Sequence, residues 1–156
     1  VLGEGVGSWL QMNIREKMNF TSDICSEIEW YEDFAVLHVK FSVDKKRFYA
    51  CMESVFETIC KLKTEITLKD LDVSIPFYLK NRVFLEDDTE EMNFILGYED
   101  FVLNRKAGDN LENNTATADR LMNAARKTFI PENLNVVVCG NCRGLTKKKI
   151  REICCT

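Results

Sequence analysis

Two cysteines near the end of the chain form the pattern most suggestive of chemistry. Cys139 and Cys142 make a Cys-x-x-Cys pair, a spacing found in redox couples and in one half of many zinc sites. The second Cys-x-x-Cys of such a zinc site is absent, and a thioredoxin-like site would need a βαβ unit before the motif. The pattern favours ordinary thiols and leaves a redox couple or a metal site as alternatives.

The chain has one histidine, His38, and this count limits hydrolytic chemistry. Zinc peptidases use two histidines on one helical face, so such a metal site cannot be built here at any spacing. His38 lies beside Lys40 in an alternating segment, with no nucleophile in an elbow-like turn, which disfavours a Ser-His-Asp or Cys-His site. We therefore expect no catalytic residue in this chain, and a His38 that faces solvent or is locally hydrogen-bonded.

Charged runs are expected to be solvated helix ends. The acidic pairs Asp87–Asp88 and Glu90–Glu91 precede an apolar helical pattern, where carboxylates complement the helix dipole. Lys147, Lys148, Lys149 and Arg151 follow a Thr146 cap near the end of the chain. We expect these basic residues to form a solvated face of a terminal helix.

Length and composition indicate one globular domain. The 156 residues are 46% hydrophobic, enough to bury a core. The net charge of −4 argues against nucleic acid as a partner, and no apolar run approaches the ~20 residues of a membrane span. Seven cysteines, an odd number, favour a reducing, intracellular compartment, either cytoplasm or a mitochondrial-type matrix. Because the chain starts at Val1, we expect it to be part of a longer protein.

The elements that must position these side chains follow from periodicity. Ser8 and Gln11 fit a capping box for a helix that runs to about Lys17. Residues 22–43 alternate with period two, which predicts two half-buried strands in an antiparallel hairpin. Asp44 is expected to cap a helix that packs on the hairpin, with Cys51 and Cys60 as packing residues. The apolar stripe of that helix consists of Phe48, Met52, Val55, Phe56, Ile59 and Leu62.

The rest of the chain reads mainly as helix. Thr67 opens a helix in which Pro76 predicts a break or kink. Further helices are expected after residues 86–88, over 117–128 and after Thr146, with a polar loop over 106–115 and a buried strand over 134–139. The order is helix, strand, strand, three or four helices, strand, helix. It predicts an α+β fold with two layers, in which helices pack on one face of a mostly antiparallel sheet.

Several segments in this order resemble one family. Arg15-Glu16-Lys17 at a helix end leads through a loop into the hairpin, and Ile66–Leu71 resembles the opening of the family's long helix. Ala125–Leu134 followed by Val136–Val138 resembles its closing helix, turn and strand. The chain is similar to the C-terminal, non-zinc-binding domain of pitrilysin/insulinase zinc metallopeptidases, a family that includes mitochondrial processing peptidase.

The resemblance implies a fold, a function and partners. Residues 1–156 would form a single, truncated, inactive C-terminal domain. Its fold would be of the metallopeptidase/LuxS-like half-domain type. It would lack the opening strand of that fold, which would leave an edge of the sheet exposed. It would be the substrate-side domain of a zinc metalloendopeptidase that hydrolyses peptide bonds. The zinc would lie in the parent's other, N-terminal domain, so the expected partners are that domain and a peptide substrate, with neither nucleic acid nor membrane.

The resemblance also singles out Arg15 and Ser22. In the family an arginine, and a tyrosine seven residues later, face the zinc and bind substrate. Arg15 matches the arginine, whereas Ser22 stands at the position of the tyrosine. Met18-Asn19 replace a pair that is usually Arg-Gly in the family. Arg15 is alternatively a helix-end residue that complements the dipole. The lost tyrosine favours a second hypothesis, a degenerate non-catalytic subunit that binds peptides or supports protein assembly. A third is an independent thiol-redox or zinc-binding module that uses Cys139 and Cys142.

Overall fold

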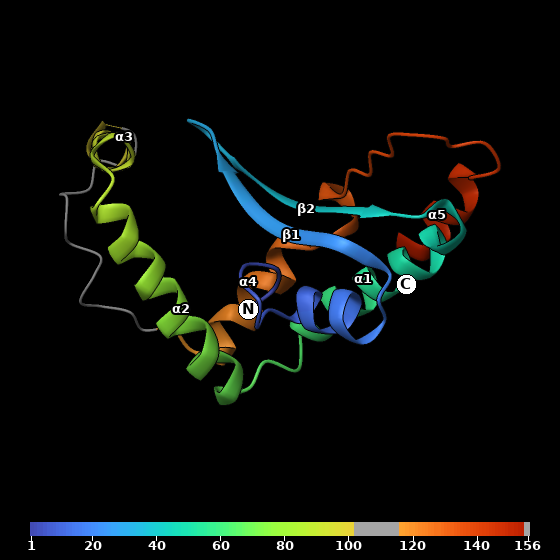
Figure 1. The fold of residues 1–156 in the computed structure, drawn as a ribbon, viewed down its shortest axis with the longest axis horizontal. Helices are drawn as coiled ribbons and strands as arrows, with labels where there is room; N and C mark the ends of the chain where they lie inside the picture. Colours follow the sequence, from blue (N-terminus) through green and yellow to red (C-terminus); the bar gives the residue numbers. More distant parts are fainter. Residues whose placement is uncertain (102–115, 155–156) are drawn as a thin grey trace.

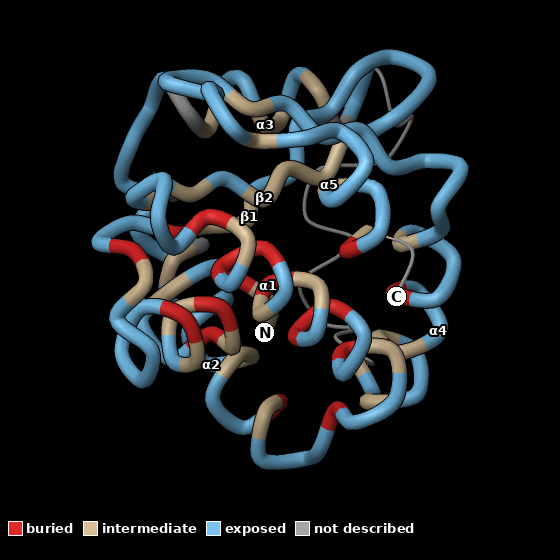
Figure 2. The backbone as a smooth tube through the Cα atoms, turned by 90° about the vertical axis from the view of Figure 1, so that its right-hand side faces the viewer, coloured by how far each residue is buried: buried red, intermediate tan, exposed pale blue. Residues whose placement is uncertain are grey.

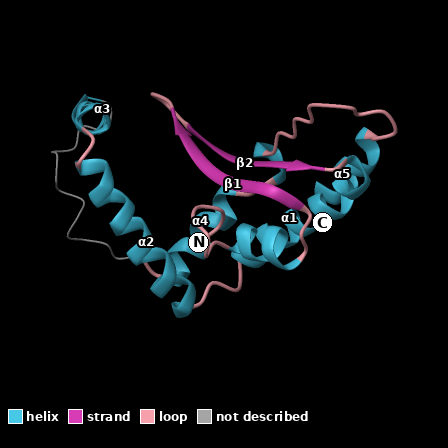
Figure 3. Ribbon diagram, viewed as in Figure 1, coloured by secondary structure: helices cyan, strands magenta, loops and turns pink. Residues whose placement is uncertain are grey.

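A long β-hairpin lies over a set of helices in the computed structural model (Figures 1 and 3). The structure describes residues 1–101 and 116–154, and within them the side chains of all but residues 82, 85, 86, 91 and 99. The elements are η1 (Gln11–Lys17), β1 (Thr21–Trp30), β2 (Ala35–Val43), η2 (Lys45–Arg47), α1 (Phe48–Leu62), α2 (Leu68–Glu86), α3 (Thr89–Phe101), α4 (Ala118–Thr128), η3 (Pro131–Asn133) and α5 (Lys147–Cys154).

The predicted α+β class is confirmed, and the hairpin is antiparallel as expected. Ile24 pairs with Phe41 and Ile28 with Leu37, so these apolar residues share one face because side chains alternate along a strand. The inner half of that face packs on the helices. The outer half does not, since Ile28 and Trp30 are 52% and 59% exposed.

The opposite face of the hairpin is polar and faces solvent. Lys40 pairs with Glu27, and His38 Nε2 lies 3.0 Å from Glu29 Oε2. Hydrogen bonds from Tyr31 and then His38 hold the pKa of the Glu29 carboxyl below its usual range. His38 is therefore locally hydrogen-bonded, as the sequence predicted.

The centre of the core lies where η1, β1 and α1 meet. Leu10, Ile14, Ile24 and Cys51 are fully buried there, and Val55 and Ile59 of α1 complete the cluster. The α1 stripe thus packs on the hairpin as predicted, with Cys51 inside it, whereas Cys60 is exposed. Figure 2 shows the buried positions of the backbone gathered around α1 and the N-terminal segment.

Two further clusters attach the later helices to this core. Leu62, Ile66 and Leu71 pack with Ala125 of α4. Phe48 and Met52 of α1 pack with Ile153 of α5. α1 therefore contributes to all three clusters, which makes it the central element of the helical layer.

The start of α2 is fixed by a polar contact to the N-terminal segment. Asp70 accepts hydrogen bonds from the Thr67 N–H (2.8 Å) and from Trp9 Nε1 (2.7 Å). Partial burial opposes ionisation of this carboxyl, but the hydrogen bonds from Thr67 and Trp9 outweigh it and lower the pKa of Asp70. The helix then continues through Pro76 to Glu86, so of the predicted break or kink the break is wrong; packing of its first turns holds the helix despite one missing N–H donor.

Other helix starts follow the prediction in part. Asp88 and Thr117 accept backbone N–H bonds at the starts of α3 and α4, and Thr146 does so weakly (3.4 Å) at α5. Asp44 precedes its helix but makes no side-chain cap bond, because a 3₁₀ turn at η2 intervenes. The predicted loop over 106–115 lies outside the described residues.

Two more expectations are overturned. The Ser8 capping box is wrong: Ser8 Oγ is buried without a hydrogen-bond partner among the described residues, and Gln11 Nε2 instead donates to Ile24 O of β1. Residues 134–139 form no strand, and Val137 is 84% exposed. An apolar run predicts a strand only if another strand supplies hydrogen bonds, and the sheet within the described part of the chain consists of β1 and β2 alone. No helix of the described residues is both long and apolar enough to cross a membrane.

Replacing Ile24 should destabilise the fold far more than the same change at Ile28. Both residues lie on one face of β1, but Ile24 is fully buried and Ile28 is half-exposed. Ile24→Ala should lower the free energy of unfolding by about 2–5 kcal/mol, and Ile28→Ala by less than about 1 kcal/mol. Urea denaturation followed by circular dichroism measures both. Equal losses would show that the outer hairpin is also packed in solution.

Candidate functional site

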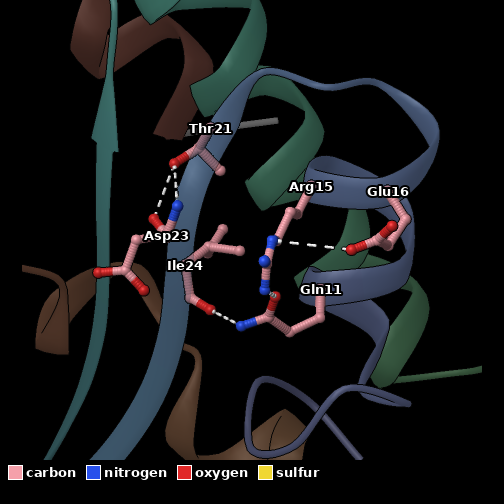
Figure 4. Close-up of polar contacts among 6 residues, drawn as sticks. All are labelled: Gln11, Arg15, Glu16, Thr21, Asp23 and Ile24. Atoms are coloured by element: carbon pink, nitrogen blue, oxygen red, sulfur yellow. Dashed lines mark hydrogen bonds and ion pairs between the residues drawn. The ribbon is translucent and has the colours of Figure 1, made fainter.

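Arg15 lies in the last turn of η1, a short π-helix that packs against β1. Its Nη1 donates to Gln11 Oε1 at 3.3 Å, and its Nε lies 3.7 Å from Glu16 Oε1 (Figure 4). Gln11 in turn donates to the Ile24 carbonyl, so a chain of hydrogen bonds runs from the guanidinium to the strand. The Arg15 side chain is still 46% exposed. Its guanidinium is thus oriented and can still bind a carbonyl or carboxylate from solution.

Ser22 is the extra residue of a β-bulge. Thr21 pairs with Val43 and Asp23 pairs with Ser42, so Ser22 has no partner on β2. The Thr21 hydroxyl fixes the bulge: it contacts the carbonyls of Asp23 (2.7 Å) and Ser42, and accepts from the Asp23 N–H (3.1 Å). Bulges redirect side chains at functional sites, and here the bulge leaves Ser22 exposed at the strand end.

Ser22 borders a surface hollow of about 490 Å³. Its walls come from the loop before β1, the end of β2 and the start of η2. Arg15 is not among the lining residues, so the structure puts Arg15 and Ser22 at the two ends of one loop without bringing them into one hollow. The lining residues are Asn19, Phe20, Thr21, Ser22, Ser42, Val43, Asp44 and Arg47.

The loop that joins these two residues depends on Asn19. Its φ is +49°, a left-handed conformation that glycine adopts freely and asparagine tolerates better than most residues. Its carbonyl accepts a hydrogen bond from Arg47 Nη1 at 2.6 Å. The resemblance places a glycine at this position, and the positive φ gives the physical reason.

Sequence reasoning missed Arg47 and misassigned Gln11. Arg47 is 28 positions from Asn19 in sequence, and no local pattern connects them. Gln11 lies four residues before Arg15. Side chains four residues apart on a regular helix are neighbours. The spacing therefore indicates a contact between Gln11 and Arg15, but the sequence interpretation assigns Gln11 to the capping box instead.

Cys139 and Cys142 lie on irregular chain between η3 and α5, not at the end of a strand. Both are exposed, and neither is bonded to another of the described cysteines; Cys142 Sγ lies 3.7 Å from the Val138 carbonyl. Among the side chains that the structure describes, no three of His, Cys, Asp or Glu are grouped as metal ligands. The described residues therefore do not fit a zinc ion, which needs three or four such ligands.

One comparison with known proteins found a similarity in the N-terminal part of the chain. Residues 1–75 match the family model described as the peptidase M16 inactive domain. The match includes η1, the hairpin, η2, α1 and the first turns of α2, and thus both Arg15 and Ser22. No curated protein matches the chain significantly.

The left-handed conformation of Asn19 predicts that glycine is tolerated at this position better than valine. Asn19→Gly should change the free energy of unfolding by less than about 0.5 kcal/mol, because glycine adopts this φ without strain. Asn19→Val should lower it by about 1–2 kcal/mol, because a β-branched side chain is strained there. Thermal unfolding of both variants tests this. A valine variant as stable as the glycine variant would contradict the assigned loop conformation.

Burial should make Cys51 the least reactive thiol. Its burial raises the pKa of that thiol to about 11, so little thiolate is present at neutral pH. Iodoacetamide at pH 8, followed by mass spectrometry, should modify the exposed Cys60, Cys139 and Cys142 in the native state and Cys51 only after unfolding.

Cys60 is also the internal control for the thiol-module hypothesis. If Cys139 or Cys142 is an ordinary thiol, its rate at pH 6 should match that of Cys60. A rate more than about tenfold higher would indicate a stabilised thiolate and would support a redox or zinc-binding module.

Proposed function

We propose that the chain, whose residues 1–75 match the family model described as the peptidase M16 inactive domain, is the substrate-side, non-zinc-binding domain of a zinc metalloendopeptidase. The chain's own described residues do not fit the metal, so the proposal assigns zinc, and the Lewis acid it supplies when bound, to the other domain of the parent. The proposed partners are that zinc-binding domain and a peptide substrate.

The observation that carries the proposal is that Arg15 is hydrogen-bonded in place and still accessible to solvent. It is held by Gln11, which is itself attached to β1, and yet half of its side chain is accessible. A guanidinium fixed in this way has lost part of its side-chain freedom before a ligand arrives, which reduces the entropic cost of binding. A residue serving only the helix dipole would need no such anchor. We assign Arg15 to binding a backbone carbonyl or carboxylate of the peptide.

Ser22 limits what this domain can contribute to catalysis. A serine hydroxyl sits one bond beyond Cβ, so it cannot reach where the tyrosine hydroxyl of the family would lie. Loss of one preorganised donor to a developing oxyanion reduces the rate by on the order of 100-fold. This observation favours the second candidate, a non-catalytic subunit of an M16 assembly that retains peptide binding through Arg15.

The test uses the full-length parent, loaded with zinc, and a pool of quenched fluorescent peptides. Arg15→Ala should lower kcat/KM by about 10- to 100-fold, because an oriented charged donor is removed. The matched control is Arg126→Ala: Arg126 is an exposed arginine that bonds Asn123 within its own helix, and its loss should leave kcat/KM within about twofold. A zinc chelator should abolish cleavage in all three proteins.

Two further outcomes separate the candidates. Ser22→Tyr should raise kcat if the missing hydroxyl limits an active peptidase. If the folded, zinc-loaded parent cleaves nothing, the active-enzyme proposal is wrong. Binding of the same peptides, measured by fluorescence anisotropy, should then still be weakened by Arg15→Ala and not by Arg126→Ala if the chain is a peptide-binding subunit.

A further inference from the structure

Two basic segments far apart in sequence, η2 and α5, are linked through Tyr49 at the start of α1. η2 contributes Lys45 and Lys46, and α5 contributes its own lysines. Tyr49 joins them: its hydroxyl accepts from the Thr146 N–H at 2.8 Å, and the Lys149 ammonium lies 4.2 Å from its ring centroid. Beneath these contacts α1 and α5 share an apolar cluster. We name this surface the basic surface; it consists of Lys45, Lys46, Lys147, Lys148, Lys149 and Arg151.

The basic surface is strongly charged for a chain whose net charge is −4. All six of its side chains are exposed. The acidic residues in these two segments are Asp44 and Glu152, and Glu152 lies 4.0 Å from Lys148. The remainder of the chain is therefore more acidic than the whole, and like charges are concentrated at one place without equal compensation. Such concentration selects a partner of opposite charge.

The described segments that carry the basic surface also expose little apolar side-chain area. Ile150 and Ile153 of α5 are turned inward against α1, and no large hydrophobic residue of the described segments 44–49 and 139–154 is strongly exposed. A helix that binds a bilayer needs an apolar face free to enter it, and this helix has none. Single-stranded nucleic acid needs exposed aromatic rings for stacking, and the ring of Tyr49 is covered by Lys149.

We propose that the basic surface binds an acidic polypeptide segment, one rich in Asp and Glu, of a partner protein. The charge and spacing of the lysines suit carboxylates on a flexible chain, because each ammonium acts as a point charge with three rotatable donors. The residues of the basic surface differ from Arg15 and Ser22, and α5 lies outside residues 1–75 that match the family model.

The charge distribution also defines the competing occupant, a second copy of this chain. Residues 86–100 contain seven Asp and Glu and no Lys or Arg. α3 lies at one end of the molecule and α5 near the other (Figure 1). Head-to-tail contact between copies would therefore also place acids on lysines, and it would generate open chains or rings. The experiment must distinguish an acidic segment of a partner protein from a second copy of this chain.

Binding is measured by fluorescence anisotropy with a labelled, flexible peptide of about 12 residues in which Glu and Asp alternate with Ser and Gly. The protein is the full chain at about 50 mM salt, where surface charges are weakly screened. The test variant is Lys45→Gln/Lys46→Gln/Lys149→Gln. The control is Lys61→Gln/Lys69→Gln/Lys127→Gln, which removes three exposed charges elsewhere. Circular dichroism confirms that both fold, and Lys149→Gln alone replaces the triple variant if it does not.

We expect the test variant to lose at least about tenfold in affinity and the control less than about threefold, with binding weakened by added salt. A Ser/Gln peptide of the same length should not bind. Equal losses in the two variants would overturn the proposal. So would tighter binding to vesicles of phosphatidylserine or to duplex DNA. Self-association of the chain in sedimentation velocity, abolished in the test variant, would reassign the surface to a second copy.

Discussion

The burial of four side chains at the junction of η1, β1 and α1 is the constraint on which the rest of this structure depends. Leu10, Ile14, Ile24 and Cys51 have no solvent exposure, and Ile14 and Ile24 lie on either side of the loop between η1 and β1. Arg15 follows Ile14 directly, and Ser22 precedes Ile24 by two residues. The apolar junction thus fixes two polar residues that contribute nothing to it.

Polar contacts add to the apolar core in fixing the conformation of the loop between η1 and β1. Gln11 links η1 to the backbone of β1, the Thr21 hydroxyl fixes the bulge, and Arg47 holds the carbonyl of Asn19. Each is a bond between a side chain and the backbone. Such bonds select among nearly equal packings, because a backbone group left without its partner on folding costs free energy. The loop is therefore specified from three sides.

Periodicity predicted the elements that bury a face of their own. The hairpin, α1, α4 and α5 carry regular apolar patterns, and all were found close to their expected positions. Prediction failed where the outcome depends on a partner distant in sequence. Ser8 lost its capping role because Gln11 found the Ile24 carbonyl, and residues 134–139 lack the neighbouring strand that their composition suits. Arg15 and Ser22 came from a family resemblance, whereas the bulge at Ser22 and the contact of Arg47 follow from three-dimensional packing that no local spacing records.

The uncovered outer half of the hairpin has a consequence for how the chain behaves at high concentration. Ile28, Trp30 and Phe34 present apolar surface beside unpaired strand edges, and the extended Val136 and Val137 add more. Exposed strand edges and contiguous apolar patches are the features through which chains adhere to one another. These exposed surfaces therefore favour aggregation of the isolated chain as its concentration rises.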